Sequence, residues 1–163
     1  MIDEKRMHIK LKTSLFLFLI GGFVGAVIDI IGRFFIDGFP LYRNYLGTIS
    51  NFIIPFYPVY GFGLIAVYLL TPLAKKINFL LKLLLFAISL TTIEFFAGVF
   101  VKLTLGIQLW DYSKSTFHLF GYIDLLHTVM WMILGTTTFY LLQKFPPKKW
   151  LFLPKKWLNK LVN

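Results

Sequence analysis

The sequence predicts an all-α polytopic integral membrane protein with about four transmembrane helices. The chain of 163 residues is 58% hydrophobic and 19% aromatic, and its mean hydropathy is +0.75. A soluble domain has about 45–50% apolar residues. The excess lies in long runs with few charges, which are typical of membrane spans. Lys and Arg gather at the ends of these runs, where lipid headgroups would lie.

The first apolar run covers residues 13–36 and follows a basic stretch, residues 1–12. A secretory signal peptide has an apolar region of about 7–15 residues and a small-residue cleavage site. This run is longer and has no convincing cleavage site, so we expect a retained first span. Asp29 and Arg33 lie four residues apart within it, on one helical face, and could form an ion pair.

The second run covers about residues 52–73 and follows a polar, aromatic connection, residues 37–51. Pro55 and Pro58 fall near its start, where proline disfavours regular helix. The segment 37–57 between the first two spans could therefore be re-entrant or interfacial.

The third run covers about residues 79–103 and contains Glu94. A polar loop, residues 104–118, leads to the fourth run, about residues 119–142, which contains Asp124 and His127. The organisation predicted from these runs has three parts. They are a cytoplasmic N-terminus (1–12), a transmembrane helical domain (13–143) and a cytoplasmic tail rich in Lys and Trp (144–163).

The tail repeats the sequence Pro-Lys-Lys-Trp-Leu, beginning at Pro147 and again at Pro154. Such a segment could lie along a membrane surface of anionic lipid, or it could be a disordered basic tail. With four spans, both termini and the connection at 74–78 share one side of the membrane. That side has thirteen flanking Lys and Arg residues and the other has four, which predicts cytoplasmic termini in the plasma membrane.

Three spans place an acid in one layer, in the outer half of the membrane. Counted from the outer ends of their spans at about 1.5 Å per residue, Asp29, Glu94 and Asp124 lie roughly 7–14 Å below the surface. An acid at that depth needs a partner or water. Arg33, His127 and Lys102 are the available partners.

This layer could be a pocket that binds a cation, a proton or a polar headgroup, or it could hold helices together by hydrogen bonds. Asp124 and His127, three residues apart, could also form a proton relay or part of a metal site, but the signal is weak and we expect no metal. The loop Trp110-Asp-Tyr-Ser could contact a substrate, or anchor at the interface and turn. The predicted pocket residues are Asp29, Arg33, Glu94, Trp110, Asp111, Tyr112, Asp124 and His127.

A second set of residues is expected to act in packing rather than in chemistry. Glycines near the start of the second run could line a pore entrance, but small residues there more often let helices approach closely. The predicted structural residues are Tyr60, Gly61, Gly63, Gly98, Gly121, Trp131 and Gly135.

Several functions are not supported by the sequence. The chain has no cysteine, so it has neither a thiolate nucleophile nor a Cys-based metal site. It lacks the P-loop pattern Gly-x-x-x-x-Gly-Lys-[Ser/Thr] and the hydrolase pattern Gly-x-Ser-x-Gly. Its net charge of +10 suits anionic lipid headgroups on the cytoplasmic side, and no motif indicates nucleic acid. No cofactor is expected.

A set of motifs spread over about residues 21–135 is similar to one known family. In order, they are Gly25-x-x-x-Asp29, Pro58-Val-Tyr-Gly-Phe-Gly63, Glu94-Phe-x-x-Gly98, Trp110-Asp-Tyr-Ser113, Phe117-His-Leu-Phe-Gly121, Trp131 and Gly135. Together they resemble a family of small multi-span membrane proteins, the ABC-transporter permeases of the CmpB type. Trp110-Asp-Tyr-Ser113 after an intramembrane Glu is the most specific part. The family favours Glu at Asp29 and Asn at His118.

The resemblance implies transport with a partner ATPase subunit. Four spans are few for a transport pathway through the membrane, so a transporting chain would work as a homo-oligomer or with a partner. A first alternative function is that of a non-enzymatic membrane interaction or assembly subunit, in which the acids only hold helices together. A second is a membrane-embedded enzyme for lipid or isoprenoid, with Glu94 or Asp124 and His127 as acid and base.

Overall fold

The computed structural model of the protein describes residues 4–37, 58–106, 108 and 110–147. Side chains are described for most of these residues, but not for 4–10, 29, 30 and 32–37. The elements are α1 (Glu4–Asp37), α2 (Pro58–Ala74), α3 (Phe79–Leu105), β1 (His118–Leu119), β2 (Ile123–Asp124) and α4 (Leu125–Lys144). The expected re-entrant segment, 37–57, lies almost wholly outside the described residues.

Three of these helices are long and apolar enough to cross a membrane: α1 through its window Leu11–Ile28, α3 and α4. The helix α2 is apolar but has only 17 residues, near the lower limit for a span. Many large apolar side chains on these helices face outward, including Ile88 (66% exposed) and Leu103 (80% exposed), as expected where lipid replaces water. The prediction of an all-α polytopic membrane protein is confirmed.

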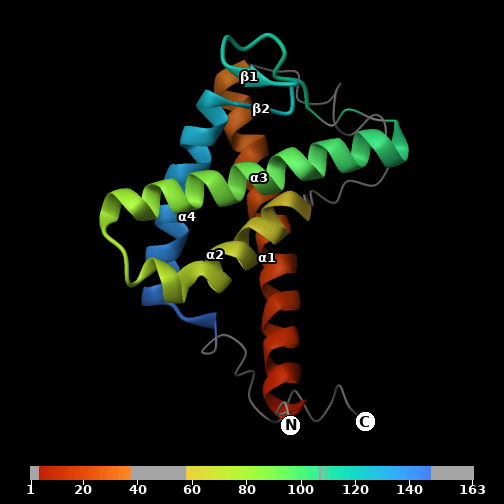
Figure 1. The fold of residues 1–163 in the computed structure, drawn as a ribbon. Coiled ribbons are helices and arrows are strands. Elements are labelled where there is room, and N and C mark those ends of the chain that lie inside the picture. The colour runs from red at the N-terminus through yellow and green to blue at the C-terminus, as the bar shows by residue number, and fades with distance from the viewer. Residues whose placement is uncertain (1–3, 38–57, 107, 109, 148–163) are drawn as a thin grey trace.

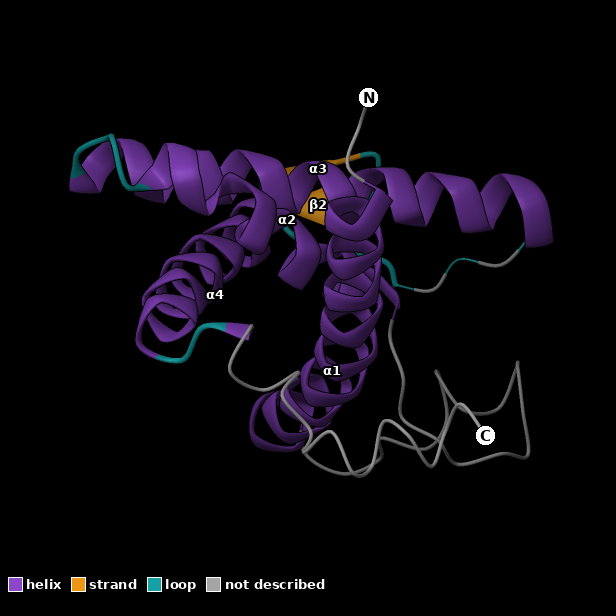
Figure 2. Ribbon diagram, turned by 90° about the horizontal axis from the view of Figure 1, so that it is seen from below, coloured by secondary structure: helices purple, strands orange, loops and turns teal. Residues whose placement is uncertain are grey.

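The helices do not form a parallel bundle. In both Figure 1 and Figure 2, α3 runs across α1 and α4 at a steep angle. The helix α1 packs mainly against α2, α3 packs mainly against α4, and α2 contacts both α3 and α4. The buried core lies where these contacts meet, at Leu17, Val67, Phe86, Leu90 and Phe139.

Two glycines on α2, only two residues apart, differ in how closely they are packed. A Cβ atom on Gly61 would lie 2.6 Å from the carbonyl oxygen of Phe18 on α1, a distance at which something must shift. A Cβ atom on Gly63 would lie 3.5 Å from the nearest atom, on Leu90, which is ordinary contact. The backbones of α1 and α2 therefore come close at Gly61, while space remains beside Gly63.

The fourth helix begins later than the predicted start near residue 119. Residues 118–119 and 123–124 instead pair as a two-stranded antiparallel hairpin, with His118 opposite Asp124. At its turn, Phe120 and Gly121 have φ angles of 52° and 73°, which a helix cannot contain. Asp124 is extended and caps the helix that follows. The apolar pattern runs through the turn and could not mark this boundary.

Candidate functional site

Glu94 lies in the apolar helix α3 and is only 4% exposed. Its Oε1 accepts a hydrogen bond of 3.0 Å from the hydroxyl of Tyr112, and its Oε2 accepts one of 2.8 Å from the indole Nε1–H of Trp131. A buried carboxylate requires such donors because it has left water. Glu94 therefore joins α3 both to the loop that carries Tyr112 and to α4.

Tyr112 connects Glu94 to a second polar pair. Its ring stacks on the ring of His127, with centroids 4.0 Å apart and planes inclined by 22°. Its backbone N–H donates to the carbonyl oxygen of Gly121 at 2.9 Å, which ties the loop to the hairpin turn. The loop between α3 and α4 thus folds back over the buried carboxylate.

Asp124 and His127 form that second pair, at the start of α4. Oδ1 of Asp124 accepts the backbone N–H of His127 at 2.7 Å and lies 2.7 Å from its ring Nδ1. The Asp124 side chain is 4% exposed and that of His127 is 31% exposed. Within the described part of the chain, no residue hydrogen-bonds to Nε2 of His127. A carboxylate that orients an imidazole in this way can help it take up and release a proton.

The two other predicted loop residues bond within the loop and hairpin. The indole of Trp110 donates to the carbonyl oxygen of Tyr122 at 2.8 Å, and Oδ1 of Asp111 accepts the backbone N–H of Ser113 at 2.9 Å. A Cβ atom on Gly98 would lie 2.8 Å from the Tyr122 ring, so α3 and the hairpin are in close contact here. Trp110 and Asp111 therefore shape the loop that presents Tyr112.

The structure brings together four of the predicted pocket residues, which we call the polar cluster: Glu94, Tyr112, Asp124 and His127. The side chains of Asp29 and Arg33 lie outside the described residues. Lys102, considered as a partner for the acids, instead reaches the carbonyl oxygen of Gly106 at 3.5 Å. The described residues contain no group of three His, Asp or Glu side chains that could hold a metal ion.

Sequence reasoning placed Trp131 among the packing residues and missed its bond to Glu94. The two residues are 37 positions apart, so no local pattern joins them. Trp131 also contacts Tyr60 on α2, with ring centroids 5.1 Å apart. Trp131 therefore connects α2 to the polar cluster, through its ring contact with Tyr60 and its hydrogen bond to Glu94.

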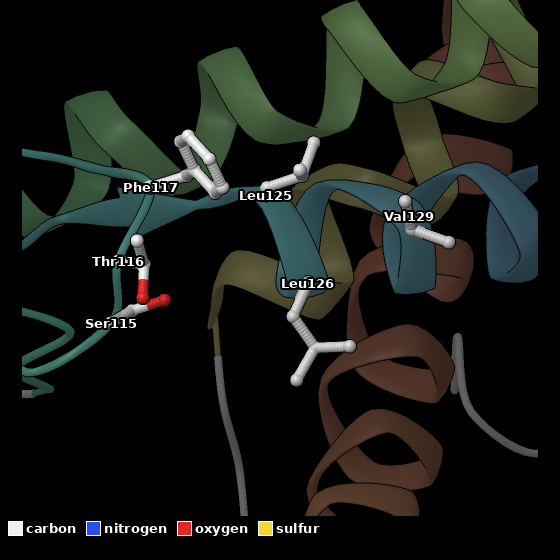
Figure 3. Close-up of a pocket in the computed structure, with 6 residues that line it drawn as sticks. All are labelled: Ser115, Thr116, Phe117, Leu125, Leu126 and Val129. Carbon is white, nitrogen blue, oxygen red and sulfur yellow. The ribbon is translucent and has the colours of Figure 1, made fainter.

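An open hollow of about 470 Å³ lies beside the polar cluster, between the loop and the first turns of α4 (Figure 3). Its lining is mainly apolar and does not include Glu94 or His127. The lining residues are Ser115, Thr116, Phe117, Leu125, Leu126 and Val129.

Asp111, in the loop outside the spans, has a shifted pKa. Hydrogen bonds from Ser113 lower the pKa of its carboxyl below the ordinary value. A lowered folded-state pKa contributes stability above the unfolded value, about 3.9 for Asp, and this stability is lost as the pH falls through the folded-state pKa.

Comparison with known protein families identifies a family for this chain. The model of a family described as "Putative ABC-transporter type IV", of the CmpB type, matches residues 16–163. No curated protein and no solved structure matches the chain. The match covers α1 from Phe16 onward and all of α2, α3, α4, the loop and the hairpin, and thus every residue of the polar cluster.

Proposed function

We propose, from the premise that this protein belongs to the CmpB family of ABC-transporter-type membrane proteins, that it is a permease-like component of a transport system. The resemblance seen in its sequence motifs is confirmed by this membership. The chain carries no P-loop pattern, so ATP would be hydrolysed by a partner subunit. The protein would work with that partner or as a homo-oligomer.

We further propose that the polar cluster is a site for a proton or a small cation, reached from outside the membrane. One observation carries this proposal: Tyr112 joins a buried carboxylate, Glu94, to a partly exposed imidazole, His127. A proton arriving at Nε2 of His127 would create an imidazolium that Asp124 stabilises. Tyr112 stacks on that ring and also donates a hydrogen bond to Glu94. A change of charge at His127 would therefore alter the interaction between Tyr112 and Glu94 on α3.

The proposed orientation places the polar cluster in the outer half of the membrane and both termini in the cytoplasm. In Figure 1 the hairpin lies at one end of the molecule, whereas the start of α1 and the end of α4 lie at the other. The second end is basic: Lys75, Lys76 and Lys144 are exposed there, and Lys82 lies 5.5 Å from the Phe139 ring centroid. Bases favour the cytoplasmic side, where anionic lipid would contact them and the tail.

A second candidate is a non-enzymatic assembly subunit, and the burial of Glu94 favours it. Both carboxylate oxygens are bonded and the residue is 4% exposed. A carboxylate in this state can simply hold α3, α4 and the loop together.

The thermal stability of detergent-purified protein across pH and a panel of cations separates the two candidates. A ligand that binds only the folded state stabilises it by about 2.7 kcal/mol at a hundredfold excess over its Kd. The site proposal predicts that one cation, or a change in pH, raises the melting temperature of the wild type. His127→Gln should abolish this shift, and Glu94→Gln should reduce it.

Lys102→Gln is the control, because Lys102 lies on α3 and bonds only to Gly106 among the described residues. It should keep the full shift. If no condition raises the melting temperature of the wild type, the site proposal is wrong. A modest loss of stability in Glu94→Gln would then support the assembly role.

A further inference from the structure

A cavity of about 230 Å³ lies where the four helices meet, and Trp131 separates it from the polar cluster. Its wall includes Gly21 on α1, Gly63 and Val67 on α2, Leu90 on α3 and Leu142 on α4. Of the four glycines in its wall, Gly63 has room for a Cβ atom, whereas a Cβ atom on Gly21, Gly25 or Gly135 would lie within 3 Å of a neighbouring atom. The space lies between α1, which packs on α2, and α4, which packs on α3 and α2.

Almost every group that lines this cavity is apolar. Its polar side-chain atoms are confined to Tyr60, Trp131 and Thr138, and the indole N–H of Trp131 is already bonded to Glu94. A water molecule in a protein interior needs two to four polar partners, and an apolar cavity of about 150 Å³ stays dry and binds benzene. A hydrocarbon group therefore suits this space better than water or an ion.

The surroundings identify the source of such a group. The cavity is partly open, and the helices that form it carry large apolar side chains on their outer faces, such as Leu19 (53% exposed) and Leu141 (51% exposed). In a membrane these faces meet acyl chains. Lipid is thus the apolar molecule present at high concentration beside the opening.

We propose that this cavity binds one acyl chain of a membrane lipid as an intramembrane ligand. The chain would lie between α1 and α4 and would contact the rings of Tyr60 and Trp131. Because Trp131 also donates a hydrogen bond to Glu94, the indole of Trp131 would contact the acyl chain on one side and the polar cluster on the other. The proposal does not rest on transport, and its test does not use a cation or a change in pH.

The test is photolabelling of the wild-type protein, reconstituted in phosphatidylcholine vesicles that include a phosphatidylcholine with a diazirine on one acyl chain. After irradiation, peptide mass spectrometry maps the labelled residues. We expect labels on Val67, Leu90 and Leu142, which are only 2%, 3% and 6% exposed. The lipid-facing Ile88, 66% exposed, should be labelled in every sample.

Gly63→Val adds carbon to the cavity at a position where a Cβ atom meets only ordinary contacts. It should reduce labelling of the three buried residues several-fold and leave Ile88 unchanged. Gly63→Ala is a smaller change and should reduce this labelling less. It replaces Gly63→Val in the experiment if the valine variant does not fold. Ile133→Phe adds volume on the exposed face of α4 and should change nothing, because Ile133 is 58% exposed and does not line the cavity.

Labels confined to Ile88 and other exposed residues would overturn the proposal. That result would also be expected if residues 38–57 of this chain, rather than lipid, filled the cavity. Equal labelling of the buried residues in wild type and Gly63→Val would also overturn it. In that case the label would reach them by a route other than the cavity.

Discussion

Gly61→Ala is expected to lower the free energy of unfolding by about 1–3 kcal/mol, the usual cost of forcing atoms into a packed interior. The added Cβ atom would lie 2.6 Å from the carbonyl oxygen of Phe18. That atom belongs to the backbone of α1, so no side-chain rotation can relieve the overlap. The helices α1 and α2 must move apart, and the contacts on both sides of Gly61 weaken.

Gly63→Ala is the matched control, because it makes the same chemical change on the same helix, two residues later in the chain. Its Cβ atom meets Leu90 at 3.5 Å, and alanine favours helix over glycine by up to about 1 kcal/mol. This variant should therefore be as stable as the wild type or slightly more stable. Denaturant unfolding in detergent, followed by circular dichroism, compares the two. Equal stability of both variants would show that α1 and α2 do not approach closely at Gly61.

Trp131→Phe is expected to cost roughly 2–3 kcal/mol, the upper range for a hydrogen bond to a charged group. The substitution keeps an aromatic ring beside Tyr60 and removes the donor to Oε2 of Glu94. Glu94 is 4% exposed, so water cannot easily replace that donor. Tyr112→Phe should cost less, because its bond to Oε1 is only partly buried and its ring still stacks on His127.

A double-mutant cycle with Glu94→Gln separates the part of this interaction that depends on the charge of Glu94 from the loss of ring area. In Glu94→Gln, the amide oxygen can still accept from Trp131, and the amide nitrogen can donate to the hydroxyl of Tyr112, which reverses its role. The single variant should therefore lose about 1 kcal/mol or less. In the Glu94→Gln background, Trp131→Phe should lower the free energy of unfolding clearly less than it does in the wild type. Additive losses, with no coupling between the two sites, would mean that the charge of Glu94 does not strengthen its hydrogen bond with Trp131.

Local chemistry was enough to predict the helices and part of the loop. Apolar runs of membrane length identified α1, α3 and α4 because each must satisfy its backbone hydrogen bonds internally wherever it lies in lipid. Glu94 and the pair Asp124 and His127 were found as candidate residues because charge inside such runs is costly. These signals depend on composition and short spacing, which a single sequence contains.

The sequence by itself therefore determined the class of fold, the approximate spans and most candidate site residues. Only the tertiary structure decided that α3 runs across α1 and α4, that the loop folds back so that Tyr112 reaches Glu94, and that Trp131 supplies the second donor. Hydrophobicity has no direction, so it brings apolar helices together without selecting their partners. The partners of Glu94 follow from close packing at Gly98 and Gly135, where the absence of a side chain lets α3 approach the hairpin and α4 closely.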